Sequence, residues 1–371
     1  MSRTWVAVGA ALAAIGLLLG LPSPNRPAAA PPGRVGASPT APAGPTLASV
    51  WPAAKPFPIP ATFPDGSAYT PNAVLGPGTS VGVTQRADGQ HIDLDEVPAD
   101  GRPRLLQTQP VTEGGSFDGI TFTTDNLYWM HAVSDGKGNA QVTLWTAARS
   151  GGPSRQLSGD VGNPAFFGSE YDVQVVGDRL YWAATRPGRQ DPTELRSIPL
   201  TGGTVSVQVL DGAWAMSRWP WLVTAPSAAS QGTRLRNVAT GQVVPVTAPP
   251  NKLLTCSPTW CRMIPDNAAQ PSGTDLIRPD GSDRRVIADA STAATGGDVA
   301  ALDRFELLMS VIEPTSQVVV SKVSLYDITR GRTVLVSPAS TDSAIRGGYL
   351  FWSTGNNETL AWYGLDLRTL N

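Results

Sequence analysis

The chain has 371 residues and a formal net charge of −2, and 41% of its residues are hydrophobic. This composition supplies enough apolar side chains for a folded core, so it excludes disorder of the whole chain. The near-neutral charge balance lacks the basic field that attracts nucleic acid, and we therefore expect no nucleic-acid partner.

Residues 1–30 have the pattern of an export segment. Arg3 precedes an apolar run from Trp5 to Leu21, and the three alanines at 28–30 offer a small-residue cleavage site. The run is also about long enough for a membrane helix, so a cleaved signal peptide and an uncleaved N-terminal membrane anchor are both open. Either one predicts an extracytoplasmic protein, secreted or tethered to the membrane. Residues 31–56 are rich in Pro and Ala, which predicts a linker before a domain at 57–371.

Within that domain one pattern recurs seven times: an apolar strand, a short turn, and a second strand that carries a large anchor residue. The anchors are Val83, Trp129, Trp182, Trp221, Trp260, Leu307 and Trp352. Their separations along the chain are 46, 53, 39, 39, 47 and 45 residues, a spacing typical of four-stranded propeller blades. The pattern predicts an all-β, seven-bladed β-propeller whose repeated tryptophans fill the core between blades.

The seventh unit is incomplete, because it supplies only three strands before Asn371. An open ring would leave an unpaired strand edge, which proteins avoid. We therefore expect Phe57–Thr70 to pair as the outermost strand beside Trp362–Leu370 and to close the ring with the two ends of the chain.

The segment "LYW", followed after a polar loop by "LRSIPLTGG", resembles the repeat of TolB-like and YWTD-type extracellular propellers. The likeness covers residues 72–371 and is sharpest around Trp129 and Trp182, although Ala183 and Ala184 stand where the YWTD signature has its acidic end. Because those families are typically six-bladed, the resemblance implies six blades as the alternative to seven.

The two cysteines, Cys256 and Cys261, flank a predicted hairpin turn, and an exported chain should oxidise them to a structural disulfide. Their spacing fits neither a zinc site nor a redox motif. The only histidines are His91 and His131. Ser80 stands in "GTSVG", which has the letters of a nucleophile elbow, but predicted strands flank it on both sides, so we interpret it as part of a polar turn.

Two acidic patterns are candidates for a site. In "HIDLDE", Asp93 and Asp95 share one strand face and Glu96 lies on the other, which favours a solvated edge strand over a cation site. In five units an acidic or amide residue stands nine to eleven positions before the anchor, where we expect the innermost strand to begin; these residues are Asn72, Asp118, Asp172, Asp298 and Asp342. Around a channel mouth they could bind a cation such as calcium or a cationic ligand, whereas the plainer interpretation is that they are turn residues.

The fourth unit adds Trp214 and Trp219 to its anchor, which predicts either an aromatic platform for a ligand or packing against the next blade. From these features we expect a monomeric, non-enzymatic binding or scaffolding domain of the cell envelope. Its expected partner is an envelope protein, a peptide or a carbohydrate, and it needs no cofactor unless the acidic residues hold calcium. The alternative is a secreted lyase or hydrolase with carboxylate or metal chemistry at the channel mouth.

Overall fold

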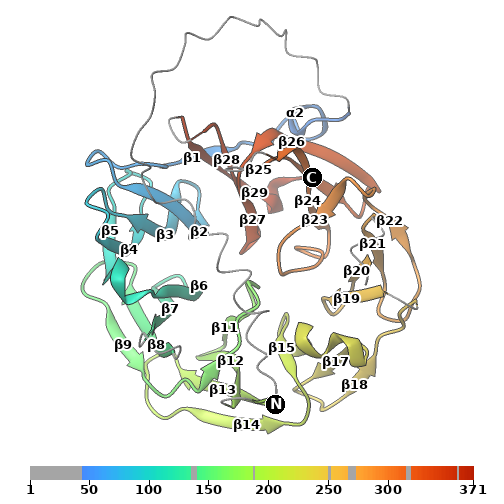
Figure 1. Ribbon diagram of the computed structural model, residues 1–371, viewed down its shortest axis with the longest axis horizontal. Helices are drawn as coiled ribbons and strands as arrows, with labels where there is room; N and C mark the ends of the chain where they lie inside the picture. Colours follow the sequence, from blue (N-terminus) through green and yellow to red (C-terminus); the bar gives the residue numbers. More distant parts are fainter. Residues whose placement is uncertain are drawn as a thin grey trace, which may run out of the picture.

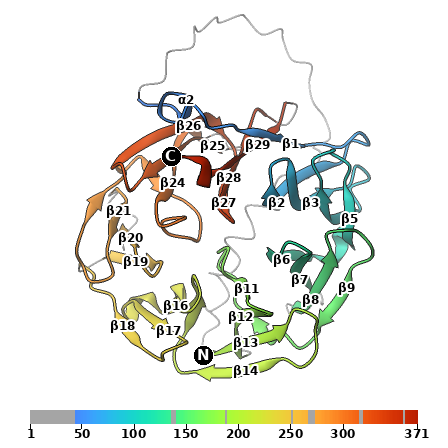
Figure 2. The same cartoon turned by 180° about the vertical axis from the view of Figure 1, so that it is seen from behind.

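The computed structural model describes residues 44–134, 140–186, 189–249, 252–265, 273–314, 319–356 and 359–371. Seven antiparallel sheets follow one another around a ring, each with four strands except the third, which has five. Figure 1 shows this ring of blades face-on, and Figure 2 shows it from behind. The seven-bladed propeller is thus confirmed, and the six-bladed alternative is wrong.

The strands follow the predicted order within each unit. Blades 1 to 3 contain β2 (Ala68–Gly76), β3 (Thr79–Gln85), β4 (His91–Val97), β5 (Arg104–Pro110), β6 (Ser116–Phe122), β7 (Asn126–Ser134), β8 (Ala140–Ala148), β9 (Arg155–Ser158), β10 (Asn163–Pro164), β11 (Val173–Val176), β12 (Arg179–Arg186), β13 (Arg189–Pro199) and β14 (Ser206–Leu210). Each anchor of these three blades lies on the second strand of its sheet, as the repeat predicts.

The remaining blades repeat the arrangement with shorter strands in the fourth and fifth. They contain β15 (Trp214–Met216), β16 (Trp221–Thr224), β17 (Arg234–Asn237), β18 (Val243–Pro245), β19 (Lys252–Cys256), β20 (Cys261–Pro265), β21 (Asp275–Ile277), β22 (Arg285–Val286), β23 (Thr292–Ala294), β24 (Phe305–Pro314), β25 (Val319–Asp327), β26 (Arg332–Ser340), β27 (Ser343–Arg346), β28 (Tyr349–Thr354) and β29 (Ala361–Asp366). The short helices are α2 (Leu47–Val50), η1 (Val111–Glu113), η2 (Pro226–Gln231) and η3 (Leu367–Thr369).

The first strand of the chain completes the last blade. β1 (Phe57–Ile59) pairs antiparallel with β29, with Phe57 opposite Gly364 and Ile59 opposite Trp362. The predicted closure of the ring is therefore confirmed for Phe57–Ile59, whereas Ala68–Thr70 already belong to β2, the innermost strand of blade 1.

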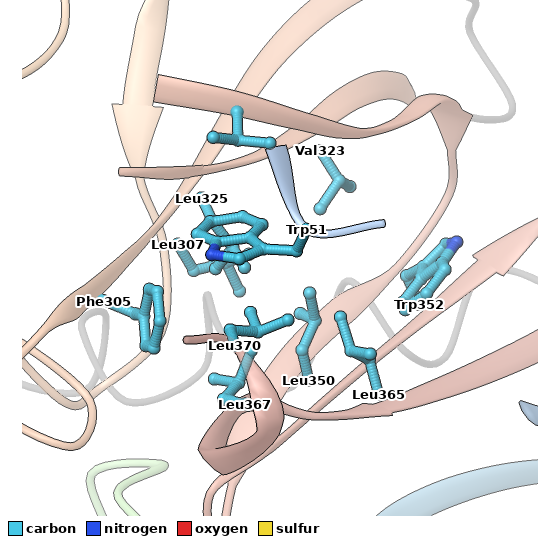
Figure 3. Close-up of a cluster of buried hydrophobic side chains, with 11 residues drawn as sticks. Trp51, Phe305, Leu307, Val323, Leu325, Leu350, Trp352, Leu365, Leu367 and Leu370 are labelled. Atoms are coloured by element: carbon cyan, nitrogen blue, oxygen red, sulfur yellow. The ribbon is translucent and has the colours of Figure 1, made fainter. Parts of the chain in front are cut away.

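The segment before β1 packs on blades 6 and 7. Leu335 of β26 donates its amide to the Pro45 carbonyl (2.9 Å), and Thr46 caps α2 with its side chain. Trp51 then enters the core between the two blades, where it is 3% exposed and meets Phe305 edge-on at 6.0 Å between ring centroids. Figure 3 shows Trp51 surrounded by side chains from blade 6 and from the C-terminal end of the chain. Residues 44–56 fall in the stretch expected to be a linker, and here they are part of the packed domain.

The repeated tryptophans form the core between blades, as predicted. Trp129, Trp182, Trp260 and Trp352 are at most 5% exposed, and Trp221 packs partly buried against the core between blades 4 and 5. Each large ring fills the space between two twisted sheets, which explains why the same residue type recurs at one position of the repeat.

The predicted disulfide is present. Cys256, the last residue of β19, faces Cys261, the first residue of β20, and their sulfur atoms are 2.07 Å apart. No helix in the described part of the chain is long and apolar enough to cross a membrane. The expected signal peptide or anchor, residues 1–30, lies outside the described residues.

The acidic residues of "HIDLDE" are placed differently from the prediction. β4 is the third strand of blade 1 rather than its edge, and Asp93, Asp95 and Glu96 are at most 4% exposed. Asp93 pairs with Arg86, Glu96 pairs with Arg104, and Asp95 accepts the Thr84 hydroxyl (2.5 Å), so each carboxylate has a partner within the blade. The solvated-edge interpretation was wrong. The alternation of residues along the strand suggested that these carboxylates face solvent, but a carboxylate that has a polar or charged partner can be buried.

Candidate ligand site at the centre of the ring

An insertion interrupts the innermost strand of blade 3. The Ala165 amide donates to the carbonyl of Ala183 (3.0 Å), and Val173 then pairs with the preceding residue of β12, Trp182. Residues 166–172 therefore have no partner on β12 and leave the sheet. We call this segment the crossing loop.

The crossing loop reaches across the ring to blade 6. The Glu170 amide donates to Oδ2 of Asp298 (2.8 Å), and the Ser169 hydroxyl donates to Oδ1 of the same carboxylate. Asp298 lies on the segment 295–304 between β23 and β24. Both views show the beginning of β11 and the segment after β23 extending toward the centre from opposite sides (Figures 1 and 2).

Blade 7 holds the crossing loop as well. Arg346 donates to the carbonyl of Gly168 (3.3 Å), and the amide of Gly347 donates to the Glu170 carboxylate. A Cβ at Gly297 would lie 3.0 Å from backbone atoms of Gly168 and Ser169, so a glycine at 297 lets the two central segments meet backbone to backbone.

A buried ion pair fixes the blade 6 side of this contact. Arg262 of β20 lies 2.7 Å from Glu306 of β24, and it also donates to the carbonyls of Gly296 (2.9 Å) and Asp298 (2.6 Å). Glu306 accepts the amide of Ala300 at 2.6 Å. These bonds satisfy both charges and orient the segment that presents the Asp298 carboxylate to the crossing loop.

Three carboxyl groups gather at this junction, and each has a raised pKa. Asp172 accepts the amides of Phe167 (2.9 Å) and Ser169 (3.0 Å) on one oxygen, whereas its other oxygen is buried without a hydrogen-bond partner. Burial raises the pKa of Asp172 to about 7, and it also raises the pKa values of Asp298 and Glu170. The negative charge of Asp298 adds to the effect at Asp172 and Glu170.

A pocket of about 230 Å³ lies between the crossing loop and blades 4 to 6. We call it the main pocket. Its apolar lining consists of Phe167, Ala215, Met216, Val223, Pro226, Ala229, Leu254 and Val299. Hydroxyl groups line it as well, from Ser169, Tyr171, Ser217, Thr224, Thr255 and Ser257, and the remaining lining residues are Cys256, Gly296, Gly297 and Asp298. An apolar cavity with a few polar groups is the usual form of a small-molecule site.

A second pocket of about 320 Å³ lies on the other side of the crossing loop, against blades 1, 2 and 7. Glu170, Arg346 and Gly347 line it, and Tyr171 lines both pockets. The loop thus separates a space lined by an arginine from the main pocket, whose described lining residues include no Lys, Arg or His.

The structure brings together only two of the five predicted channel-mouth residues. Asp172 and Asp298 both bind the backbone of the crossing loop, as described above. Asp298 follows the innermost strand β23 instead of starting it, so its alignment with the other units was wrong. Asp118 is the third residue of β6 and accepts the Ser116 hydroxyl.

The other two predicted residues take no part in the junction. Asn72 stands at an irregularity of β2 between Pro71 and Ala73. Asp342 is exposed and directly precedes β27. No group of three or more His, Cys, Asp or Glu side chains in the described part of the chain is placed to hold a metal ion.

The two extra tryptophans of blade 4 pack against their neighbours. Trp214 is 3% exposed, belongs to the core between blades 3 and 4, and donates its ring N–H to the Asp211 carbonyl (2.7 Å). Trp219 is partly buried and lies against Tyr181 with 4.3 Å between ring centroids. Both tryptophans therefore pack against residues of blades 3 and 4, which agrees with the packing interpretation and not with an aromatic platform for a ligand.

The serine of "GTSVG" lies within a strand. Ser80 is the second residue of β3, is 1% exposed and bonds the Tyr69 hydroxyl (2.9 Å). The strand-to-helix turn that a nucleophile elbow requires is absent at this position.

Sequence analysis did not identify the residues that build the junction: Ser169, Glu170, Arg262, Glu306 and Arg346. One signal was available, because the largest anchor separation, 53 residues between Trp129 and Trp182, contains the crossing loop. An excess of residues just before an anchor marks an insertion into the innermost strand, but spacing alone does not say what the insertion contacts.

Comparison with known proteins identifies no family. No protein-family model matches the chain, and neither does any curated protein. Among solved structures it is similar to the uncharacterized protein lmo1340 from Listeria monocytogenes EGD-e, at 10% identity and a TM-score of 0.48, over 82% of this chain and 93% of that one.

Two other similar structures are a domain of a protease and a peptidase. The β-propeller domain of the Trilobed protease from Pyrococcus furiosus is 10% identical, with a TM-score of 0.44, over 68% of this chain and 83% of that domain. A puromycin-hydrolyzing peptidase from Mycobacterium tuberculosis is 13% identical, with a TM-score of 0.48, over 89% of this chain and 54% of the peptidase. At such identities these similarities carry no argument about activity.

Proposed function

We propose that the protein is a non-enzymatic, extracytoplasmic binding domain of the cell envelope and that the main pocket is its ligand site. The observation that carries this proposal is the pocket itself. It has an apolar lining with interspersed hydroxyl groups, and it lies where the crossing loop meets blades 4 to 6. An apolar lining favours burial of a ligand's hydrocarbon part, and hydroxyl groups orient its polar end.

Sequence features support the proposed extracytoplasmic location of the protein. The apolar segment Trp5–Leu21 suits an export signal or a tether, and the oxidised pair Cys256 and Cys261 is typical of an oxidising compartment. We further propose that the chain is a monomer related to the TolB-like and YWTD-type propellers, on the strength of the "LYW" and "LRSIPLTGG" segments. Envelope proteins, peptides and carbohydrates remain the expected partners.

The pocket can be tested with 2-phenylethanol, a neutral probe that has an apolar body and one hydroxyl. Ala229 lines the pocket from η2, whereas its neighbour Ala228 belongs to the same short helix and does not line it. In calorimetric titrations of the full-length chain, we expect the probe to bind the wild type and Ala228→Trp but not Ala229→Trp. Equal binding by both variants, or no binding by the wild type, would contradict the proposed site.

The location is tested separately with a reporter. A phosphatase that folds only in an oxidising compartment is fused after Pro60, with and without residues 1–30. We expect activity only from the fusion that retains residues 1–30. Equal activity of the two fusions would contradict export by this segment without affecting the proposal about the pocket.

A further inference from the structure

The charges around the main pocket are unbalanced. Among the described residues that line it, only Asp298 is ionised in its usual state near neutral pH, and none is Lys, Arg or His. Glu170 and Asp172 are both close enough to Asp298 for its negative charge to raise their pKa values. The formal charge among the described lining residues is therefore negative, in a cavity that is partly shielded from water.

The neighbouring arginines are engaged elsewhere. Arg262 is paired with Glu306 and bonded to two carbonyls, so its charge is matched within blades 5 and 6. Arg346 bonds the Gly168 carbonyl and lines the second pocket on the far side of the crossing loop. Arg218 is paired with Asp303 at 2.7 Å. None of these guanidinium groups lines the main pocket.

From this arrangement, and resting on the proposed function, we infer that the main pocket selects a small organic cation: an apolar body that carries an ammonium group. The apolar residues Met216, Val223 and Leu254 would contact the body, and the Asp298 carboxylate and nearby hydroxyls would accept hydrogen bonds from the ammonium.

An anion of the same shape is disfavoured for two reasons. It would enter an apolar site in which no described lining residue is cationic, and it would face the carboxylate of Asp298. Burial already raises the pKa of Asp298, which means that its charged form lacks full solvation. An ammonium group would replace part of the missing solvation, whereas a carboxylate would add repulsion.

The test compares three probes with the same phenylethyl body: 2-phenylethylamine, 2-phenylethanol and phenylacetate. Each is titrated calorimetrically into the full-length chain near neutral pH. We expect the amine to bind about tenfold or more tighter than the alcohol, the range of one charge-assisted hydrogen bond, and phenylacetate to bind more weakly than the alcohol. N-acetyl-lysine methylamide serves as a fourth probe, because it distinguishes a lysine side chain of a peptide from a free amine as the source of the ammonium.

The matched variant is Asp298→Asn, which removes the charge while its amide oxygen can still accept the Glu170 amide. We expect it to reduce the amine-to-alcohol affinity ratio to about one. If this variant does not fold, as judged by its thermal unfolding, Glu170→Gln takes its place, with a smaller reduction in the same ratio.

The outcomes separate the two proposals. If the alcohol binds and the amine binds no tighter, or if phenylacetate binds as well as the amine, cation selection is overturned and the pocket remains a ligand site. If none of the probes binds the wild type, the ligand site itself is overturned. If the amine preference persists in Asp298→Asn, the preference does not arise from this carboxylate and the inference fails.

Discussion

The amide nitrogen of Glu170 lies 2.8 Å from Oδ2 of Asp298, although 128 residues separate them in the chain. In a repeat fold each unit normally contacts only its neighbours, but this bond joins blade 3 to blade 6. Because blade 7 also bonds the crossing loop, three blades share one central junction. Residues of this junction form one wall of the main pocket. The shape of the pocket therefore depends on contacts between blades and not on any single blade.

The junction depends on the missing side chain of Gly297. In Gly297→Ala the new methyl group would press on the backbone of Gly168 and Ser169 at 3.0 Å, and backbone atoms cannot move aside as a flexible side chain can. We expect a loss of about 1–3 kcal/mol in the free energy of unfolding, measured by urea denaturation, together with faster proteolysis within 166–172.

Gly76→Ala is the control for this substitution, because nothing lies within 4 Å of a Cβ built at Gly76. Its unfolding free energy should stay within about 0.5 kcal/mol of the wild type. Equal stability of Gly297→Ala and Gly76→Ala would show that the central segments do not meet as closely as described.

Asp172 should make the protein less stable as the pH rises from about 4 to about 7. Its pKa is raised to about 7 in the folded state, whereas an unfolded aspartate titrates near 3.9. Between these values the unfolded chain releases a proton that the folded chain keeps, so the free energy of unfolding falls with rising pH, by at most about 1.4 kcal/mol per unit.

The contribution of Asp172 is isolated with Asp172→Asn. This variant should lose that pH dependence and gain stability relative to the wild type toward neutral pH, as measured by urea denaturation at several pH values. Parallel stability curves for the two proteins would mean that Asp172 titrates as an ordinary surface carboxyl.

His131 should have the opposite dependence. The side chain of His131 is 8% exposed. Its Nδ1 lies 2.7 Å from the side-chain nitrogen of Gln107, and its Nε2 is hydrogen-bonded to the side-chain oxygen of Gln109. Burial lowers the pKa of His131 below its unfolded value near 6.5, so protons bind preferentially to the unfolded chain below that pH. Stability attributable to His131 is thus complete above about pH 6.5 and is lost as the pH falls. The wild type should lose more stability than His131→Gln between pH 7 and pH 5, and an equal loss would contradict a neutral buried imidazole.

The ring could be predicted from sequence, but its centre could not. The spacing of anchors such as Trp129 and Trp182 identifies the blades because every blade must fill the same gap with a large side chain. The same reasoning predicted closure by Phe57, since an unpaired edge had to be covered. The contact of Ser169 with Asp298 does not recur with the sequence repeat, so the repeat could not predict it. It depends on how far the inserted crossing loop extends across the closed ring.

Position within a unit was the weaker inference. Asp298 was aligned with Asp172 by counting back from the anchors. The segment 295–304 is longer than the corresponding turns of the other blades, so Asp298 lies after its strand and not at the start of it.

The burial of Trp51 was not predicted, for a different reason. The Pro- and Ala-rich composition around it suggests a linker, and one large aromatic residue in such a segment gives no period from which packing can be predicted.

Trp51 should nevertheless contribute strongly to stability. It fills the core between blades 6 and 7 with Phe305 and Leu370, and Trp51→Ala would leave a cavity there. We expect a loss of about 3–5 kcal/mol in the free energy of unfolding. Trp51→Phe keeps most of the ring and removes an indole N–H that is buried without a partner, so it should cost much less. A mild effect of Trp51→Ala would indicate that the N-terminal segment does not hold the two blades together.

The outer edge of blade 3 should be the most prone to aggregation. Each blade ends in an outermost strand, and six of these seven strands contain a proline or an arginine, both of which discourage pairing with another chain. The exception is β14, where Val207 and Val209 are 45% and 50% exposed. Val207→Lys should therefore reduce light scattering of concentrated, warmed solutions while changing the free energy of unfolding by less than about 0.5 kcal/mol.

Val243→Lys is the matched control for Val207→Lys. Val243 is 41% exposed on β18, an edge strand that Pro245 already protects. If both lysines reduced scattering equally, the effect would come from net charge and not from protection of the β14 edge.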